Sequence, residues 1–360
     1  MDISVIGASG ACGREIVIQL IRDRLLEQRE ILQLVASNPH SSHPYWLHGF
    51  RADLQDAYAE IIPQLDVTDD PGAIIGDVVI MAGGATIAAD LQGNGIASRD
   101  ALAACNRPVF ERFAQALGAA RRHSPPVVIV VTNPVELGVH LFAQHLPRDC
   151  VLGMGAHSDS LRFRWEIAHD LGIRRQLVRG YMLGEHGAGM VPLWSSVRVH
   201  GLTRAEWTAT ERRLRRGVDT ADFPAVLAAE QQRLVEMLQQ NPVSGPAEAL
   251  RHVATLPPDL RVALKPFAIH YTAAKTLEAT ANATLELVRA ICEGRPTEIV
   301  AQYQHAGEAG LHVPFGARLI VAGAVERWIP IEGYWREEME LIQRSAEGIQ
   351  AKLTRWLATA

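Results

Sequence analysis

Short apolar runs alternate with longer amphipathic stretches through the first 150 residues. Apolar positions at helical spacing follow the first run at residues 16–25 and recur across residues 101–120. Four runs have the length and the β-branched content of buried strands: residues 2–6, 31–36, 78–81 and 127–131. Alternating strands and helices predict a parallel sheet with helices on both faces, and therefore an α/β fold.

The pattern changes to α+β after about residue 151. The later elements are expected to be a long helix at residues 276–293, strands near 298–303 and 317–322, and a closing helix at 336–357. At 360 residues, of which 48% are hydrophobic, the chain can bury two cores. We therefore expect an N-terminal domain at residues 1–150 and an α+β domain at residues 151–360.

A glycine-rich turn follows the first predicted strand and precedes the first predicted helix. It reads Gly7-Ala8-Ser9-Gly10-Ala11-Cys12-Gly13. Glycines in this position allow backbone N–H groups to approach a pyrophosphate at the N-terminus of the helix. The turn favours a dinucleotide-binding domain of Rossmann type, and the alternative is a tight turn in another kind of α/β protein.

Three residues with complementary chemistry lie in two segments of the second half. Asp159 and Arg162 stand three positions apart in an apolar-periodic stretch, so that on a helix they share one face. His186 lies in the glycine-flanked segment Gly184-Glu185-His186-Gly187. A buried aspartate can orient an imidazole for proton transfer, and a guanidinium can bind a carboxylate through two parallel hydrogen bonds. These residues favour an enzyme, although an Asp-Arg pair at this spacing is also typical of a surface salt bridge.

The order and spacing of these segments resemble the lactate/malate dehydrogenase family over most of the chain. The similar segments are residues 7–13, 131–135 (Val-Thr-Asn-Pro-Val), 159–163 (Asp-Ser-Leu-Arg-Phe), 184–187 and 190–193 (Met-Val-Pro-Leu), followed by 98–100, Asn106 and 313–316. The resemblance implies an N-terminal Rossmann-type parallel sheet and a C-terminal α+β substrate domain. It also implies hydride transfer between a nicotinamide cofactor and a 2-oxo or 2-hydroxy acid.

Carried over residue by residue, the resemblance implies a role for each polar residue of the site. His186 would be the proton donor and acceptor, and Asp159 its partner. Arg162 would bind the substrate carboxylate, and Asn133 would hydrogen-bond a substrate oxygen. Arg99, on a mobile loop, would polarise the carbonyl that receives the hydride, the alternative being a solvated loop arginine.

The cofactor contacts implied by the resemblance gather around the ends of the predicted strands. They are Gly7, Ser9, Gly10, Ala11, Cys12, Gly13, Ser37, Asn38, Gly83, Asn106, Thr132 and Asn133. In dinucleotide sites an acidic residue at the end of the second strand binds the ribose hydroxyls and disfavours a phosphate there. Residues 36–38 contain no carboxylate, and residues 31–50 contain no arginine. The choice between NAD and NADP stays open, with NAD as the first expectation.

Residues 85–98 depart from the family's pattern, because they are longer than expected and contain no Lys or Arg. Malate-type members carry a second arginine there for the distal carboxylate, so the segment argues against malate. Gln92 and Asn94 either face an uncharged substrate tail or are solvent-facing turn residues. A cationic partner for a second carboxylate can still come from Arg204, from the arginine cluster at 212–216 or from Lys275.

Residues 201–266 form a connection longer than the family's usual one, with a helical run at 226–238. We interpret it as a helical insertion near the substrate side. It either caps the pocket or forms an oligomer interface, and the sequence does not choose. Four arginines at 212–216, interrupted by Leu214, are typical of a solvated helix face rather than of a nucleic-acid surface.

Composition and charge narrow the range of partners. The net charge of −5 gives no electrostatic case for binding nucleic acid or an anionic membrane. Four scattered cysteines show neither metal-site spacing nor a disulfide framework, which fits a reducing cytoplasm and no bound metal. No apolar run has the length of a membrane span, and a core strand at residues 2–6 leaves no room for a signal peptide. We expect a cytoplasmic homodimer or homotetramer.

The sequence therefore predicts a two-domain oxidoreductase that interconverts a 2-oxo acid and a 2-hydroxy acid, with malate disfavoured. One alternative is an NADP-dependent malate dehydrogenase-like reductase. Another is a dinucleotide-binding protein without turnover, although such a protein has no physical need for Asp159, Arg162 and His186 together.

Overall fold

The N-terminal half of the molecule is a parallel sheet. The computed structural model describes residues 1–37, 45–86, 98–241, 243–270, 272 and 274–358. The parallel strands are β1 (Ile3–Ile6), β2 (Ile31–Val35), β3 (Gln64–Thr68), β4 (Val78–Met81), β5 (Val127–Val130) and β6 (Val151–Gly153). They lie in the order β3-β2-β1-β4-β5-β6. This order is typical of Rossmann-type dinucleotide-binding sheets and confirms the predicted α/β class.

The same sheet continues beyond β6 with antiparallel strands. In spatial order these are β9 (Thr297–Gln304), β10 (Pro314–Ala322), β7 (Val178–Gly184) and β8 (Met190–Val199), and β11 (Ala324–Trp328) also pairs with β10. The predicted domain boundary near residue 150 thus falls just before a strand of one continuous sheet. The change from parallel to antiparallel pairing between β6 and β9 marks the transition to the second half.

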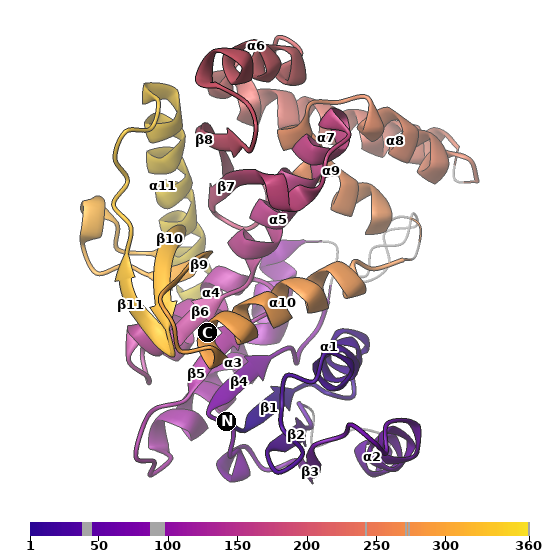
Figure 1. Cartoon of the computed structure of the whole chain (residues 1–360), viewed down its shortest axis with the longest axis vertical. Helices are drawn as coiled ribbons and strands as arrows, with labels where there is room; N and C mark the ends of the chain where they lie inside the picture. The colour runs from indigo at the N-terminus through magenta and orange to yellow at the C-terminus, as the bar shows by residue number, and fades with distance from the viewer. Residues whose placement is uncertain (38–44, 87–97, 242, 271, 273, 359–360) are drawn as a thin grey trace.

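Helices cover both faces of the sheet, as Figure 1 shows. They are α1 (Ala11–Arg22), α2 (Trp46–Ala57), α3 (Arg99–Ala119), α4 (Val135–Ala143), α5 (Gly155–Leu171), α10 (Leu277–Cys292) and α11 (Arg336–Ala358). Short 3₁₀ turns lie at Pro71–Ala73, Arg148–Cys150, Arg175–Leu177, Thr220–Asp222 and Glu308–Gly310. Helix α10 packs beside α1, so that an element of the second half borders the first helix of the chain (Figure 1).

Four further helices gather beyond β7 and β8, at the end of the molecule opposite β1–β3 (Figure 1). They are α6 (Arg204–Arg215), α7 (Phe223–Gln240), α8 (Gly245–Ala254) and α9 (Pro258–His270). Their apolar side chains form a separate buried cluster with α5 and β8, including Phe163, Trp194, Leu234 and Leu260. The helical insertion expected at 201–266 therefore coincides with a group of helices that has its own core.

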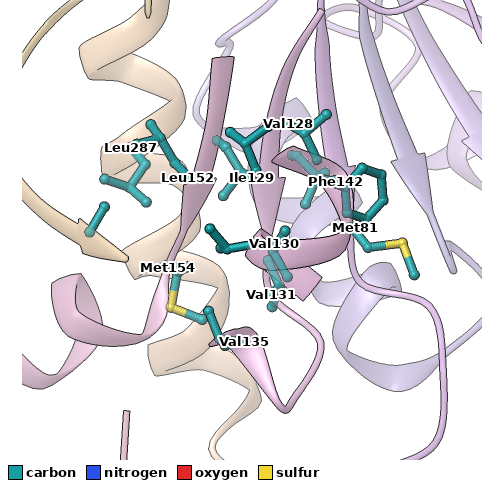
Figure 2. Close-up of a cluster of buried hydrophobic side chains, with 14 of the residues drawn as sticks. Met81, Val128, Ile129, Val130, Val131, Val135, Phe142, Leu152, Met154 and Leu287 are labelled. Atoms are coloured by element: carbon teal, nitrogen blue, oxygen red, sulfur yellow. The ribbon is translucent and has the colours of Figure 1, made fainter. Parts of the chain in front are cut away.

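The central strands of the sheet are buried on both faces. Val128, Ile129 and Val130 of β5 are fully buried, as is Leu152 of β6. Figure 2 shows these side chains between Phe142 of α4 and Leu287 of α10. Strands buried on both faces read as continuous apolar runs, which is why β5 is visible in the sequence. This packing fixes the carboxyl ends of β4 and β5, where the polar residues discussed below begin.

Within the described residues, no helix is both long enough and apolar enough to cross a membrane.

Candidate active site

Close backbone contacts surround the glycine-rich turn after β1. Gly7 has φ +84°, and a Cβ on it would collide with the backbone of Gly83, which follows β4. A Cβ on Gly13 would collide with the carbonyl oxygen of Gly7. The absence of side chains thus lets the first turn of α1 approach the end of β1, as a pyrophosphate-binding turn requires.

The N-terminus of α1 presents unused backbone donors. Gly10 is the N-cap residue and supplies no side-chain cap, and the first turn contains no acidic residue. The N–H groups of Ala11, Cys12 and Gly13 therefore suit an anion, since the first donors of a helix have no intrahelical partner. Burial raises the pKa of the Cys12 thiol to about 11, so that the thiol stays neutral beside this site. The turn fits a dinucleotide pyrophosphate.

An arginine of helix α3 contacts the backbone just after β2. Arg112 of α3 donates from Nη2 to the carbonyl oxygen of Ser37, two residues after β2. Its Nε atom is buried, and no partner for it lies among the described residues. Ser37 also packs against Gly83, since a Cβ on Gly83 would collide with Cβ of Ser37. Asn38 lies outside the described residues.

Two asparagines shape the loop after β5. Asn133 lines the cavity that His186 and Arg162 also border. Its Oδ1 atom is buried without a partner in the described part of the chain. Asn106 of α3 is fully buried and donates from Nδ2 to the carbonyl oxygens of Ala85 (2.9 Å) and Asn133 (2.7 Å). Its Oδ1 accepts from the N–H of Ala85 at 2.7 Å. Asn106, which we predicted to bind the cofactor, thus lies behind the cavity wall and joins two loops that border it.

The predicted imidazole and carboxylate meet. Nδ1 of His186, which follows β7, lies 2.7 Å from Oδ2 of Asp159 on α5. A carboxylate accepts, so Nδ1 carries the proton and Nε2 is the ring nitrogen available to a ligand. Gly155 makes room for the ring, because a Cβ there would lie 2.5 Å from Cβ and Cγ of His186.

Arg162 binds the other oxygen of the same carboxylate. Its Nη1 atom donates to Oδ1 of Asp159 at 3.1 Å, as expected for positions three apart on a helix. Asp159 is only 1% exposed, so this is a buried pair rather than a surface salt bridge. Arg162 also lines the cavity beside His186, which places the guanidinium where it can meet a ligand carboxylate.

Arg99 is the first residue of α3, with Ser98 as its N-cap, instead of lying within a loop as expected. Its Nη1 atom lies 3.1 Å from Oε1 of Glu185, and its Nη2 donates to the carbonyl oxygen of His186. Both oxygens of Glu185 accept from Nζ of Lys352 on α11, each at 2.6 Å. The guanidinium is thus held against the histidine segment by a carboxylate that a second cation balances.

A second buried carboxylate fixes the backbone of the histidine. Glu136, in the first turn of α4, accepts from the N–H of His186 at 2.7 Å. Burial, and then the nearby charge of Glu185, raise the pKa of Glu136. The raised pKa reflects the cost of two buried carboxylates close to the same histidine segment.

One cavity of about 400 Å³ joins these groups. His186, Arg162, Asn133 and Arg99 border it together with Cys12 of the first turn of α1. Helices α7 and α9 supply another part of its wall: Gln231, Val262, Ala263, Pro266, Phe267 and His270. Lys275 lines it as well, whereas Arg204 and residues 212–216 do not. Gln92 and Asn94 lie outside the described residues.

Comparisons with known proteins find similarity to lactate/malate dehydrogenases. Residues 1–151 match the NAD binding domain of lactate/malate dehydrogenase. The L-2-hydroxycarboxylate dehydrogenase (NAD(P)(+)) of Methanocaldococcus jannaschii is 30% identical over 209 residues, which are 56% of this chain and 62% of that protein. These matches show that the chain is similar to lactate/malate dehydrogenases in its N-terminal part. L-lactate dehydrogenase A of Hordeum vulgare is 31% identical over 206 residues, 56% of this chain and 52% of that one. The matches thus span only about half to three fifths of these relatives.

Solved structures of lactate and malate dehydrogenases share the fold over nearly the whole chain. Malate dehydrogenase from Cryptosporidium parvum has a TM-score of 0.75 at 20% identity and covers 99% of both chains. Lactate dehydrogenase from the same organism, complexed with lactic acid and nicotinamide adenine dinucleotide, has a TM-score of 0.75 at 20% identity and covers 100% of this chain and 98% of that one. This likeness shows that the chain shares the overall fold of these proteins.

Sequence reasoning missed the residues that support the candidate site. Glu136 and Glu185 stand next to motifs that we recognised, and their neighbourhood was the available signal. Lys352 lies 167 positions after Glu185, and Arg112 lies 75 positions after Ser37. No local pattern indicates either contact.

Replacing Lys352 by Met should lower the free energy of unfolding by about 2–3 kcal/mol, because the buried carboxylate of Glu185 loses one of its two cations. Urea unfolding followed by circular dichroism measures the change. Arg336→Met, on the same helix, is the matched control, since its ion pair with Glu340 is exposed and should contribute at most about 0.5 kcal/mol. Equal effects of the two substitutions would contradict a structural role for the Glu185–Lys352 pair.

Proposed function

We propose that this protein is an NAD(P)-dependent 2-hydroxy acid dehydrogenase that interconverts a 2-oxo acid and a 2-hydroxy acid. The observation that carries the proposal is the bond of 2.7 Å between His186 and the buried Asp159, in the same cavity as Arg162 and the first turn of α1. A bound nicotinamide cofactor supplies or accepts the hydride. The relative named L-2-hydroxycarboxylate dehydrogenase supports this class of substrate.

His186 handles the proton in this proposal. With Nδ1 bonded to Asp159, Nε2 is the ring nitrogen available for proton transfer in the cavity that His186 lines. When a 2-oxo acid is reduced, the imidazolium donates its Nε2 proton to the former carbonyl oxygen, which becomes the hydroxyl. In the reverse direction neutral Nε2 accepts the hydroxyl proton. Asp159 stabilises the imidazolium and holds the ring in one tautomer.

Two arginines and Asn133 position the substrate. The carboxylate of a 2-oxo acid offers two oxygens to the planar guanidinium of Arg162, which fixes its orientation as well as its charge. Arg99 lies at the histidine segment, where its charge can stabilise the negative charge that develops on the substrate oxygen. The unpartnered Oδ1 of Asn133 is an acceptor suited to the hydroxyl form of the substrate.

The choice of cofactor depends on the end of β2. Ser37 places a neutral residue there, where a carboxylate would disfavour a ribose 2′-phosphate. Arg112 adds a cation at the same point. We propose that NAD is the cofactor and that NADP is also accepted, in line with the printed name of the Methanocaldococcus relative. A malate-specific reductase is less well supported. It needs a cation for the second carboxylate of the substrate, and of the three candidates named from the sequence only Lys275 lines the cavity.

His186→Asn should reduce kcat by about 10²–10⁴, because the proton donor is lost, while NADH affinity stays unchanged. Steady-state kinetics with a panel of 2-oxo acids and fluorescence titration with NADH measure the two quantities. His200→Asn, at an exposed position after β8, serves as the control with normal activity. If the wild-type protein binds NADH but reduces none of the acids, the alternative of a dinucleotide-binding protein without turnover holds.

Arg162→Lys should raise KM and lower kcat, with a combined loss in kcat/KM on the order of 10², because a point charge binds the carboxylate without orienting it. The comparison uses the best substrate from the same panel. Arg174→Lys, at an exposed position before β7, should keep wild-type kinetics. Wild-type kinetics in Arg162→Lys would remove this residue from the substrate site.

Arg112→Gln should weaken the binding of NADPH by roughly tenfold and that of NADH much less, as expected for one lost charge-assisted contact of about 1.5 kcal/mol. Fluorescence titration gives both dissociation constants without turnover. Arg121→Gln, an exposed substitution just after the same helix, is the control. An equal change for the two cofactors would show that Arg112 supports the loop instead of reading the phosphate.

A further inference from the structure

Helix α9 turns one face toward the cavity that contains His186 and Arg162. The cavity-lining residues of this helix are Val262, Ala263, Pro266, Phe267 and His270. Their spacing of one, three and four positions places them on a single side of the helix. Four of the five carry aliphatic or aromatic side chains, so this face offers a ligand mainly apolar surface.

The opposite contacts of α9 hold it firmly on α5. Nε of Arg261 lies 2.7 Å from Glu166, and its Nη2 lies 2.8 Å from Asp170. Arg261 is only 4% exposed, and Lys265, one turn later, adds a bond of 3.0 Å to Glu166. Because α5 also carries Arg162, the distance between the substrate anchor and the apolar face is set by rigid elements. The wall is therefore preformed.

The three cations among the described residues that line the cavity each bond to other groups. Arg162 bonds to Asp159, and Arg99 bonds to Glu185 and the histidine backbone. Lys275 donates to Oγ1 of Thr86 at 3.2 Å, and its charge acts on the Cys12 thiol in the first turn of α1. Lys275 therefore stands on the side of the pyrophosphate-binding turn. A second carboxylate placed against α9 would lie unpaired on apolar surface, which is unfavourable.

We propose that the preferred substrate is a 2-oxo acid with a large apolar side chain, aromatic or branched aliphatic, which packs against the face of α9. This inference rests on the proposed function. Arg162 binds the carboxylate end, and the side chain extends toward Ala263 and Phe267. A methyl side chain leaves this surface in contact with water, whereas a larger one buries it, and hydrophobic burial is proportional to the apolar area removed from water.

The first experiment compares kcat/KM for phenylpyruvate and 4-methyl-2-oxopentanoate with that for pyruvate and oxaloacetate, at saturating NADH. The large apolar acids should exceed both small acids by at least about 10², since each additional methylene in an apolar pocket is worth roughly 10–200-fold. A preference for pyruvate or oxaloacetate would overturn this inference and leave the proposed function standing. Reduction of none of the acids would overturn the proposed function itself.

The second experiment introduces a larger side chain on the cavity-facing side of α9. Ala263→Phe should lower the ratio of kcat/KM for phenylpyruvate to that for pyruvate by at least about tenfold, because the new ring occupies the space of the substrate side chain. Ala225→Phe, the same substitution at an exposed position of α7, should leave the ratio unchanged. NADH titration of both variants shows whether the dinucleotide site is intact. An unchanged ratio in an Ala263→Phe variant that binds NADH normally would remove α9 from the substrate site.

Discussion

The buried carboxylate of Asp159 is the interaction on which the rest of the site depends. A carboxylate that is 1% exposed needs strong partners, because burial of an unpaired charge costs several kcal/mol. Its two partners are the groups with the proposed chemical roles: His186 on one oxygen and Arg162 on the other. The requirement that stabilises the folded state therefore also fixes the spacing between the proton carrier and the substrate anchor.

Two buried carboxylates and two cations hold the segment that contains His186. Glu136 holds the backbone N–H of His186, while Glu185 holds Arg99 and is itself balanced by Lys352. Two cations face two carboxylates here, and the raised pKa of Glu136 reduces the repulsion between the acids. Arg99 therefore stands at the site already oriented, and the C-terminal helix α11 takes part in placing it.

The sequence predicted what local patterns encode and missed what distant segments build together. Strand β5 reads as a continuous apolar run because both of its faces are buried, whereas the edge strand β3 is only half-buried and gives no such signal. The pairing of Asp159 with Arg162 follows from helix geometry. The contact of Arg112 with Ser37 depends on how α3 crosses the end of β2, so the absence of a nearby arginine in the sequence was an incomplete guide to the charges at that end.

Helix α5 links the proposed chemistry to the proposed specificity. Asp159, Arg162, Glu166 and Asp170 lie along one stripe of it, since successive positions differ by three or four residues. The N-terminal half of the stripe bonds to His186, and the C-terminal half bonds to Arg261 of α9. A movement of α9 relative to His186 would therefore require breaking buried ion pairs. Under the proposed function, side chains on the inner face of α9 can therefore change which substrate fits while the geometry around His186 stays constant, because the two sets of residues share no member and α5 holds them at a fixed distance.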